Sequence, residues 1–257
     1  MAILILCIAA LITSLLTFFS GFGLGTILTP VFAIFFPVEI AIALTGIVHF
    51  LNNIFKLMLI GKHADKQVVV RFGVPAIFAA LLGAFLLLQI SELEPIHSYT
   101  IGDKLFQITP IKLIVAILII FFSLMEIIPR LKKIQFGKDK LILGGLLSGF
   151  FGGLSGNQGA LRTAFLIRSG LSKEAFIATG IVIACLIDFT RIGVYSIRFL
   201  KSGLQENLTL VIAATLSAFI GAYLGSRLLK NVTFSTIQII VTVMLIMLSL
   251  GIGSGLV

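Results

Sequence analysis

The chain has 257 residues, of which 59% are hydrophobic and only 11% are charged. A soluble domain of this size carries roughly twice that share of charged residues, so the composition excludes an ordinary soluble protein. Apolar segments long enough to cross a bilayer, roughly 17–25 residues each, recur along the whole sequence. The period-two alternation of a membrane β-barrel is absent. The chain is therefore predicted to be an all-α polytopic membrane protein.

The apolar segments, in chain order, are 1–36, 39–60, 68–90, 111–128, 141–169, 175–197, 207–229 and 233–256. The first is too long for one straight crossing, because at about 1.5 Å per residue it would extend over roughly 54 Å. It is interrupted by the stretch GFGLG at Gly21–Gly25 and by Pro30. The segment 141–169 is interrupted by GGLSGNQGALRT at Gly152–Thr163. Each interrupted segment is predicted to be a broken helix or a hairpin of two shorter helices, followed by three transmembrane helices.

The net charge of +9 is carried mainly by short loops and segment ends, so it indicates membrane topology rather than nucleic-acid binding. The loop 130–140, RLKKIQFGKDK, is strongly basic and is predicted to be cytoplasmic. The loop 61–67 is also basic, whereas the loop 91–110 is acidic and is predicted to lie outside. The predicted sides of these three loops alternate, as they must if each segment between them crosses the membrane once.

Two stretches separated by 134 residues resemble each other, ALTGIV at 43–48 and IATGIV at 177–182. Further matches, the last with a small length difference, are Gly25 with Gly159 and Gly83 with Gly221. Chance similarity between helices rich in small residues is the alternative, but the shared order of segments argues against it. If each broken segment returns to the side it left, the halves are inverted repeats, a plan typical of secondary transporters. The predicted parts are a first membrane repeat 1–128, a cytoplasmic basic linker 129–140 and a second membrane repeat 141–257.

A few polar side chains lie too deep in these segments to reach an interface: His49, Asn52, Asn53, Arg162, Asp188 and Arg191. Charged groups at membrane depth cost roughly 2.5–3.5 kcal/mol on insertion scales, so they normally face the bundle interior or an aqueous cavity. Asp188 and Arg191, three residues apart, have the alternative role of a folding pair. For His49 the alternative role is that of a hydrogen-bonded interior histidine. For Asn52 and Asn53 it is hydrogen bonding between helices. Lys56 lies nearer the segment end and is expected to snorkel to the interface.

The two glycine-rich breaks have the composition of an anion site. Glycines let backbone N–H groups converge on one point, and a helix that restarts there adds the positive end of its dipole. Tight helix packing is the alternative explanation of the glycines, but it does not explain Asn157, Gln158 or Arg162. The predicted anion-binding residues are Gly21, Gly23, Gly25, Thr26, Asn52, Asn53, Ser155, Gly156, Asn157, Gln158, Gly159 and Arg162.

The stretches GFGLGTILTP at 21–30, ALTGIV, GGLSGNQGALRT and IATGIV resemble the TauE/SafE family of sulfite and organosulfonate exporters, over nearly the whole chain. The resemblance implies a prokaryotic inner-membrane carrier with two repeats that moves a small anion. The family's glycine motifs would fall on Gly21, Gly23, Gly25, Gly153, Gly156 and Gly159. The second break departs from the commoner glycine-rich family pattern, which suggests a subgroup with a different ligand.

We therefore expect a secondary transporter of small anions, sulfite or an organosulfonate by resemblance, working by alternating access at a midplane site. His49 or Asp188, supported by Arg191, is predicted to couple protons, since histidine titrates near neutral pH and a buried carboxyl group can retain a proton. The sequence has no GxxxxGK[ST], HExxH or GxSxG motif, which disfavours direct ATP use and an intramembrane enzyme. Another small anion, such as a carboxylate or an inorganic oxyanion, and a channel rather than a carrier stay open.

The expected partners are the lipid bilayer and a small anionic substrate, and no nucleic acid, cofactor or metal is predicted. Cys7 and Cys185 lie in apolar segments without metal-ligand spacing and are expected to be packed thiols. Self-association into a homo-oligomer stays open, because lipid-facing and partner-facing apolar surfaces look alike in sequence.

Overall fold

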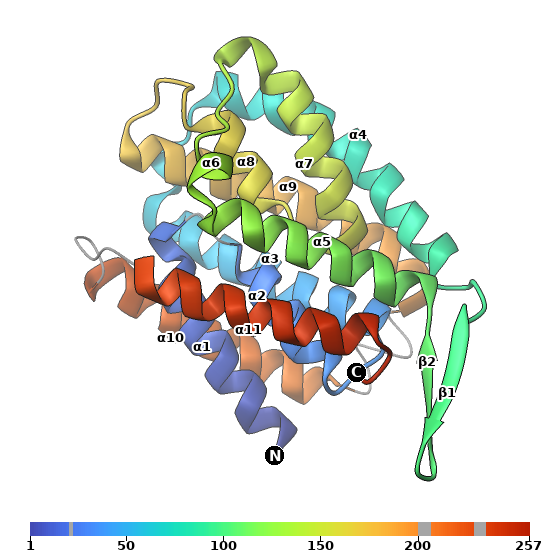
Figure 1. Ribbon diagram of the computed structural model, residues 1–257. Coiled ribbons are helices and arrows are strands. Elements are labelled where there is room, and N and C mark those ends of the chain that lie inside the picture. Colours follow the sequence, from blue (N-terminus) through green and yellow to red (C-terminus); the bar gives the residue numbers. More distant parts are fainter. Residues whose placement is uncertain (21–22, 200–206, 229–234) are drawn as a thin grey trace.

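The computed structural model describes residues 1–20, 23–199, 207–228 and 235–257 (Figure 1). In that part of the chain the bundle is built from α1 Ala2–Ser20, α2 Leu24–Ala33, α3 Val38–Ile60, α4 Lys66–Ile90, α5 Pro110–Ile127, α7 Leu141–Ser155, α8 Gly159–Leu166, α9 Lys173–Phe199, α10 Leu208–Leu228 and α11 Ser235–Gly253. Short helical turns lie between some of them: η1 Gly61–His63, α6 Pro129–Lys132 and η2 Lys138–Lys140. The long helices follow the predicted apolar segments. The helical membrane-protein class is thus confirmed.

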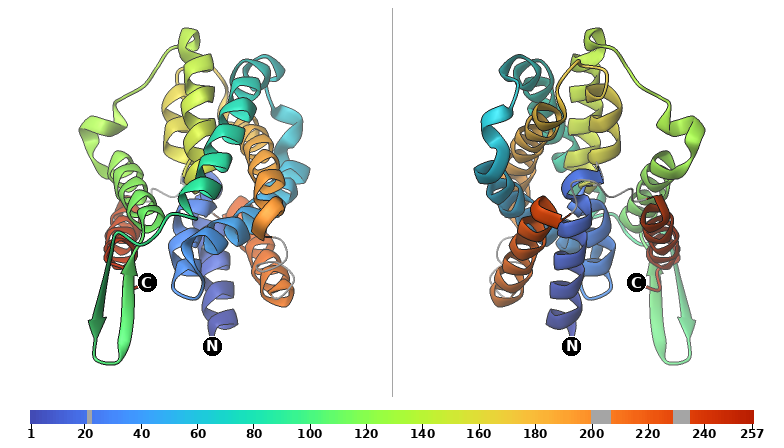
Figure 2. Two further views of the ribbon diagram at one scale, coloured as in Figure 1. Left: turned by 90° about the vertical axis from the view of Figure 1, so that its right-hand side faces the viewer. Right: turned by 90° about the vertical axis from the view of Figure 1, so that its left-hand side faces the viewer.

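Both broken segments form helical hairpins, α1 with α2 and α7 with α8. The helix α7 ends at Gly156, whose φ of 78° lies in the left-handed region that glycine adopts without steric cost. The helix α2 begins directly after Gly23, which has extended backbone. Figure 2 shows the two hairpins entering the bundle from opposite ends.

A β-hairpin lies outside the helical bundle, within the loop predicted over 91–110. Its strands, β1 His97–Ile101 and β2 Lys104–Ile108, pair antiparallel. Gly102 has a φ of 60°, the positive value that two-residue hairpin turns require at their first position. The Tyr99 hydroxyl donates a hydrogen bond of 2.7 Å to the carbonyl oxygen of Ser254, which holds the hairpin against the end of the chain. The sequence analysis did not predict this sheet, and it is an addition to the all-α description.

Small residues bring pairs of helices to backbone distance. A methyl group at Gly83 of α4 would collide with the backbone carbonyl of Phe150 in α7, and one at Gly221 of α10 would collide with that of Leu11 in α1. On the α7 side of the first contact, a stripe of glycines faces the carbonyls of α4: Gly145, Gly149 and Gly153. In lipid, where apolar burial does not drive helices together, such close packing is a main source of association energy.

The basic and acidic loops lie at opposite ends of the bundle. Figure 2 shows the connection between α3 and α4 and the start of α7 at one end, and the β-hairpin and both termini at the other. Five described helices, α3, α4, α5, α9 and α10, are long and apolar enough to cross a membrane. The chain is therefore a multi-pass membrane protein, and the positions of the loops agree with the sides predicted from their charges.

Candidate functional site

The two breaks meet in the middle of the bundle. Gly25, in the first turn of α2, packs against the turn that follows α7, and a methyl group on it would lie 3.3 Å from the carbonyl oxygen of Gly156. These glycines belong to the two stretches that the sequence analysis paired. The tips of the two hairpins are therefore neighbours in space.

The polar residues of the second break serve mainly the turn itself. The Ser155 hydroxyl accepts hydrogen bonds from the backbone N–H of Asn157 at 3.4 Å and from its side-chain amide at 3.3 Å. It donates to the carbonyl oxygen of Phe151 at 3.1 Å. The Ser148 hydroxyl donates to the carbonyl oxygen of Gln158 at 3.3 Å. These hydrogen bonds replace the backbone hydrogen bonds of the α-helix that are lost where the left-handed Gly156 ends α7.

A fully buried ion cluster lies beside the second break and joins α3 to α9. Oδ2 of Asp188 accepts a hydrogen bond of 2.6 Å from Nδ1 of His49. Its Oδ1 accepts one of 2.9 Å from Nε of Arg191, whose terminal nitrogen is also 2.9 Å away. Asp188 and Arg191 are 0% exposed and His49 is 3% exposed. Burial of this kind is tolerated only because each charge is paired.

Two glycines make room for the guanidinium of this cluster. A methyl group at Gly46 would lie 3.2 Å from Cζ of Arg191, and one at Gly156 would lie 2.9 Å from a terminal nitrogen of the same side chain. The matched glycine of the second repeat has a related role, since a methyl group at Gly180 would lie 3.4 Å from Nε of Arg162. Each Thr-Gly-Ile-Val stretch thus carries a glycine on which an arginine packs.

A short chain of hydrogen bonds extends from the ion cluster on both sides. The side-chain amide nitrogen of Gln158 donates a hydrogen bond of 3.5 Å to Oδ1 of Asp188. The side-chain oxygen of Gln158 accepts a hydrogen bond of 3.2 Å from Arg162. On the other side the amide of Asn53 donates to Nε2 of His49 at 3.3 Å, which suits an imidazole that is protonated on Nδ1. The asparagine on α3 and the arginine on α8 are therefore connected through the buried carboxylate.

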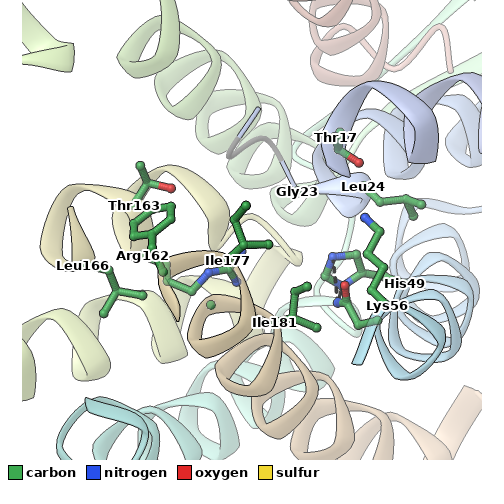
Figure 3. Close-up of a pocket in the computed structure, with 13 residues that line it drawn as sticks. Thr17, Gly23, Leu24, His49, Lys56, Arg162, Thr163, Leu166, Ile177 and Ile181 are labelled. Carbon is green, nitrogen blue, oxygen red and sulfur yellow. Dashed lines mark hydrogen bonds between the residues drawn. The ribbon is translucent and has the colours of Figure 1, made fainter. Parts of the chain in front are cut away.

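A pocket lies between the tip of the first hairpin, α3, α8 and the start of α9 (Figure 3). Its volume is about 60 Å³, which leaves room for a few water molecules or one small solute. Polar and charged side chains reach it from three helices, α1, α3 and α8: Thr17, His49, Asn53, Lys56, Arg162 and Thr163. The apolar part of its wall comes from residues such as Leu24, Leu166 and Phe176. In Figure 3, Arg162 lies on one side of the pocket and His49 and Lys56 lie on the other.

The predicted site residues divide into three groups. Those that line the pocket are Gly23, His49, Asn53 and Arg162. Those that lie behind its wall or within the hairpins are Gly25, Thr26, Asn52, Ser155, Gly156, Asn157, Gln158, Gly159, Asp188 and Arg191. Gly21 falls outside the described residues. Asn52 is buried and accepts a hydrogen bond of 3.1 Å from the hydroxyl of Ser14, the contact between helices considered as its alternative. Contact with a substrate stays a prediction for all of them.

Three polar lining residues were not among the predicted site residues: Thr17, Lys56 and Thr163. The expectation that Lys56 snorkels to the interface is wrong, since the side chain is only 5% exposed and lines the pocket. The signal was present in the sequence, because Asn53 and Lys56 are three residues apart and share one face of a helix. The Thr17 hydroxyl has no hydrogen-bond partner among the described residues, so it can donate to a bound solute.

The arrangement is suited to binding an anion. Lys56 and Arg162 supply positive charge, while hydroxyl and amide groups supply hydrogen-bond donors. No group of three or more His, Cys, Asp or Glu side chains that could hold a metal ion occurs in the described part of the chain. Cys185 is buried and Cys7 is partly buried, and both are free thiols.

Comparison with known proteins gives one clear result. The family profile described as "Sulfite exporter TauE/SafE" matches residues 6–252, which is nearly the whole chain. No curated protein and no solved structure matches it.

Proposed function

The chain belongs to the sulfite exporter TauE/SafE family, a family of membrane transporters, and on that premise we propose that it carries small anions across the membrane by alternating access. The observation that carries the proposal is a small basic pocket beside the point where two helical hairpins meet. Broken helices that meet between two repeats are the usual site of substrate binding in secondary transporters.

The packing of the helices supports two inverted repeats. Exchanging α1, α3, α4 and α5 for α7, α9, α10 and α11 maps the most extensive contacts among these eight helices onto one another or onto themselves. The contact of α4 with α7 becomes that of α10 with α1, and the contact of α4 with α9 becomes that of α10 with α3. The pairs α3–α9 and α5–α11 map onto themselves. The matched glycines Gly83 and Gly221 make equivalent close contacts, as inverted repeats require.

The electrostatics of the pocket support an anionic substrate. Arg162 donates to Gln158 with one terminal nitrogen, and a planar guanidinium has further donors that suit a sulfite or sulfonate group. The unpartnered hydroxyl of Thr17 faces the same pocket. The family supplies the sulfur chemistry, so sulfite or an organosulfonate is the proposed substrate, and another small oxyanion or a carboxylate is the alternative.

Proton coupling is assigned to the pair of His49 and Asp188. Their hydrogen bond of 2.6 Å connects α3 of the first half with α9 of the second, and Arg191 holds the carboxylate from the other side. A proton that enters or leaves this pair changes the charge beside the pocket and the attraction between the two halves. The proposed location is the inner membrane of a prokaryotic cell, with the loop 129–140 in the cytoplasm.

Counterflow of isotopically labelled sulfite in proteoliposomes tests the proposal. Vesicles loaded with unlabelled sulfite and kept free of oxygen should take up label in a saturable way, and faster than vesicles without internal sulfite. Uptake that is neither saturable nor stimulated by internal substrate would indicate a channel. Failure to move any of sulfite, sulfonates, sulfate or carboxylates would reject the transport of small anions.

A further inference from the structure

A second and larger pocket lies at the end of the bundle that carries the β-hairpin. Its volume is about 480 Å³, which is in the range of pockets that hold a small ligand. One wall is the connection between α2 and α3. The opposite wall is formed by the end of β2, the start of α5 and the last residues of the chain. It shares no lining residue with the pocket beside the hairpins, so it is a separate candidate site.

Two opposite charges line this second pocket. Glu39 is in the first turn of α3, and Lys112 is in the first turn of α5. The Glu39 carboxylate forms no hydrogen bond and no ion pair with any described residue, although its charge acts on Lys112. The Lys112 ammonium donates to the carbonyl oxygen of Gln107 at 3.3 Å and to that of Gly255 at 3.5 Å. An ammonium group has three N–H donors, so one remains for a ligand.

Both charged residues lie at the depth of lipid headgroups. The helices α3 and α5 are each long and apolar enough to cross a membrane, and their first turns are at one end of that crossing. The pocket also has apolar lining residues that are open to the outside, since Ile34 is 46% exposed and Leu256 is 52% exposed. Acyl chains can cover these side chains, whereas a solute from water would leave them exposed.

We propose that this pocket binds the headgroup of phosphatidylethanolamine from the surrounding bilayer. The primary ammonium group of the lipid donates charge-assisted hydrogen bonds to the Glu39 carboxylate, and its phosphodiester accepts one from Lys112. Phosphatidylcholine has the same two charges, but its quaternary ammonium group has no N–H to donate. Phosphatidylglycerol has the phosphodiester and lacks the ammonium group. The two side chains therefore favour a zwitterionic lipid with a primary ammonium group.

A lipid bound in this pocket joins two parts of the fold. Lys112 holds α5 to the end of the chain, and the Tyr99 hydroxyl holds the β-hairpin to the same end through Ser254 (Figure 1). The other wall of the pocket belongs to the first hairpin and to α3, which carries Glu39. The headgroup contacts both walls at once, so its binding stabilises the folded protein.

Lipids with identical acyl chains and different headgroups test the proposal. Native mass spectrometry of the full-length protein in detergent measures the apparent Kd of dioleoyl phosphatidylethanolamine, phosphatidylcholine and phosphatidylglycerol. The natural chain is compared with Glu39→Gln and Lys112→Met. The controls are Glu94→Gln and Lys104→Met, because both residues are exposed at the same end of the molecule. Glycerophosphoethanolamine, the same headgroup without acyl chains, distinguishes a free solute from a lipid.

The natural chain and both controls should bind phosphatidylethanolamine at least about tenfold more tightly than phosphatidylcholine, since a hydrogen bond to a charged group is worth about tenfold or more. Glu39→Gln should lose most of this preference. Lys112→Met should weaken the binding of both lipids and keep the preference, because both have the phosphodiester. Glycerophosphoethanolamine should bind far more weakly than the lipid.

Three results would overturn the inference. Equal affinities of the natural chain for phosphatidylethanolamine and phosphatidylcholine are expected if Glu39 and Lys112 only neutralise each other. A preference that Glu39→Gln retains would place the ammonium group elsewhere. Glycerophosphoethanolamine that binds as tightly as the lipid would assign the pocket to a free solute. Sulfite counterflow tests the other pocket, so the anion transport proposal stands or fails independently of these results.

Discussion

The two helical hairpins have the same backbone plan and different chemistry. Each contains a glycine-rich stretch, and the two hairpins touch where Gly25, at the start of α2, faces Gly156. In the second half the polar groups follow the turn directly, with Gln158 on the break and Arg162 on α8. In the first half the glycine-rich stretch contains no charged residue, and the pocket receives the Thr17 hydroxyl from α1 and its other polar groups from α3, the helix after the hairpin. The glycine-rich stretches of the two hairpins are thus alike, whereas most of the polar groups beside them come from different elements in the two halves.

The asymmetry continues along the matched helices α3 and α9. The positions 134 residues after His49, Asn53 and Lys56 are Ile183, Ile187 and Thr190. The two isoleucines are 0% exposed and belong to the apolar core with Phe72, Ala76 and Ala80 of α4. One repeat therefore uses this helix face for a polar site and the other uses it for packing. In the proposed repeats, the backbone contacts of Gly83 and Gly221 match while the side chains on this helix face do not.

The largest expected effect is on the ion cluster that joins the two halves. Asp188→Ala removes the acceptor of His49 and leaves the Arg191 guanidinium buried without its partner, which costs about 3–5 kcal/mol. The measurement is the free energy of unfolding in mixed micelles. Glu92→Ala is the control, because its ion pair with Arg198 is between side chains 56% and 37% exposed and is worth at most about 1 kcal/mol. Equal small losses in both variants would contradict the structural role of the cluster.

The repeat itself predicts two matched losses of stability. Gly83→Ala and Gly221→Ala each push a methyl group into a backbone carbonyl of the facing helix, and each should cost on the order of 1–3 kcal/mol. Gly193→Ala, on a helix face with no atom within 4 Å, should be neutral or slightly stabilising. The same unfolding assay applies. A severe loss at one of the two matched glycines and none at the other would break the equivalence of α4 and α10.

The smallest expected effect is the difference in stability between an alanine substitution at Gly156 and one at Gly23. Gly156→Ala forces an alanine into the left-handed region, which costs about 1–2 kcal/mol, and places its methyl group 2.9 Å from the Arg191 guanidinium. Gly23→Ala should change stability by less than about 0.5 kcal/mol, since Gly23 has a φ of −75° and the nearest neighbouring atom is 3.6 Å away. Thermal unfolding of the two variants side by side measures the contrast. Equal costs would mean that the turns are more alike than the structure indicates.

Most of the fold could be predicted from the sequence because it depends on local patterns. Apolar length determines the crossings, and the glycine breaks determine the hairpins. The β-hairpin was missed although the strands His97–Ile101 and Lys104–Ile108 flank the turn pair Gly102-Asp103, which is a short signal beside much longer apolar segments.

The site was less predictable because it depends on contacts between distant segments. The structure places the deep polar residues His49, Asn53 and Arg162 on the pocket wall, and the binding role expected from their depth in the bilayer stays a prediction. The sequence could not separate Asn53, which lines the pocket, from its neighbour Asn52, which bonds to Ser14. Adjacent residues on a helix point about 100° apart, and only the packing of the neighbouring helices decides which one faces the cavity. The burial of Lys56 was missed for the same reason.

The central claim, that the pocket at the meeting of the hairpins binds the transported anion, is tested most directly by sulfite counterflow with Arg162→Gln. Arg168→Gln is the matched control, since Arg168 is exposed on the same hairpin and bonds only to Gln135 among the described residues. The account predicts that Arg162→Gln lowers the rate of counterflow at limiting sulfite by at least about tenfold, because a charge-assisted contact is lost. Arg168→Gln should retain the natural rate. An Arg162→Gln protein that is folded and transports sulfite at the natural rate would contradict the claim.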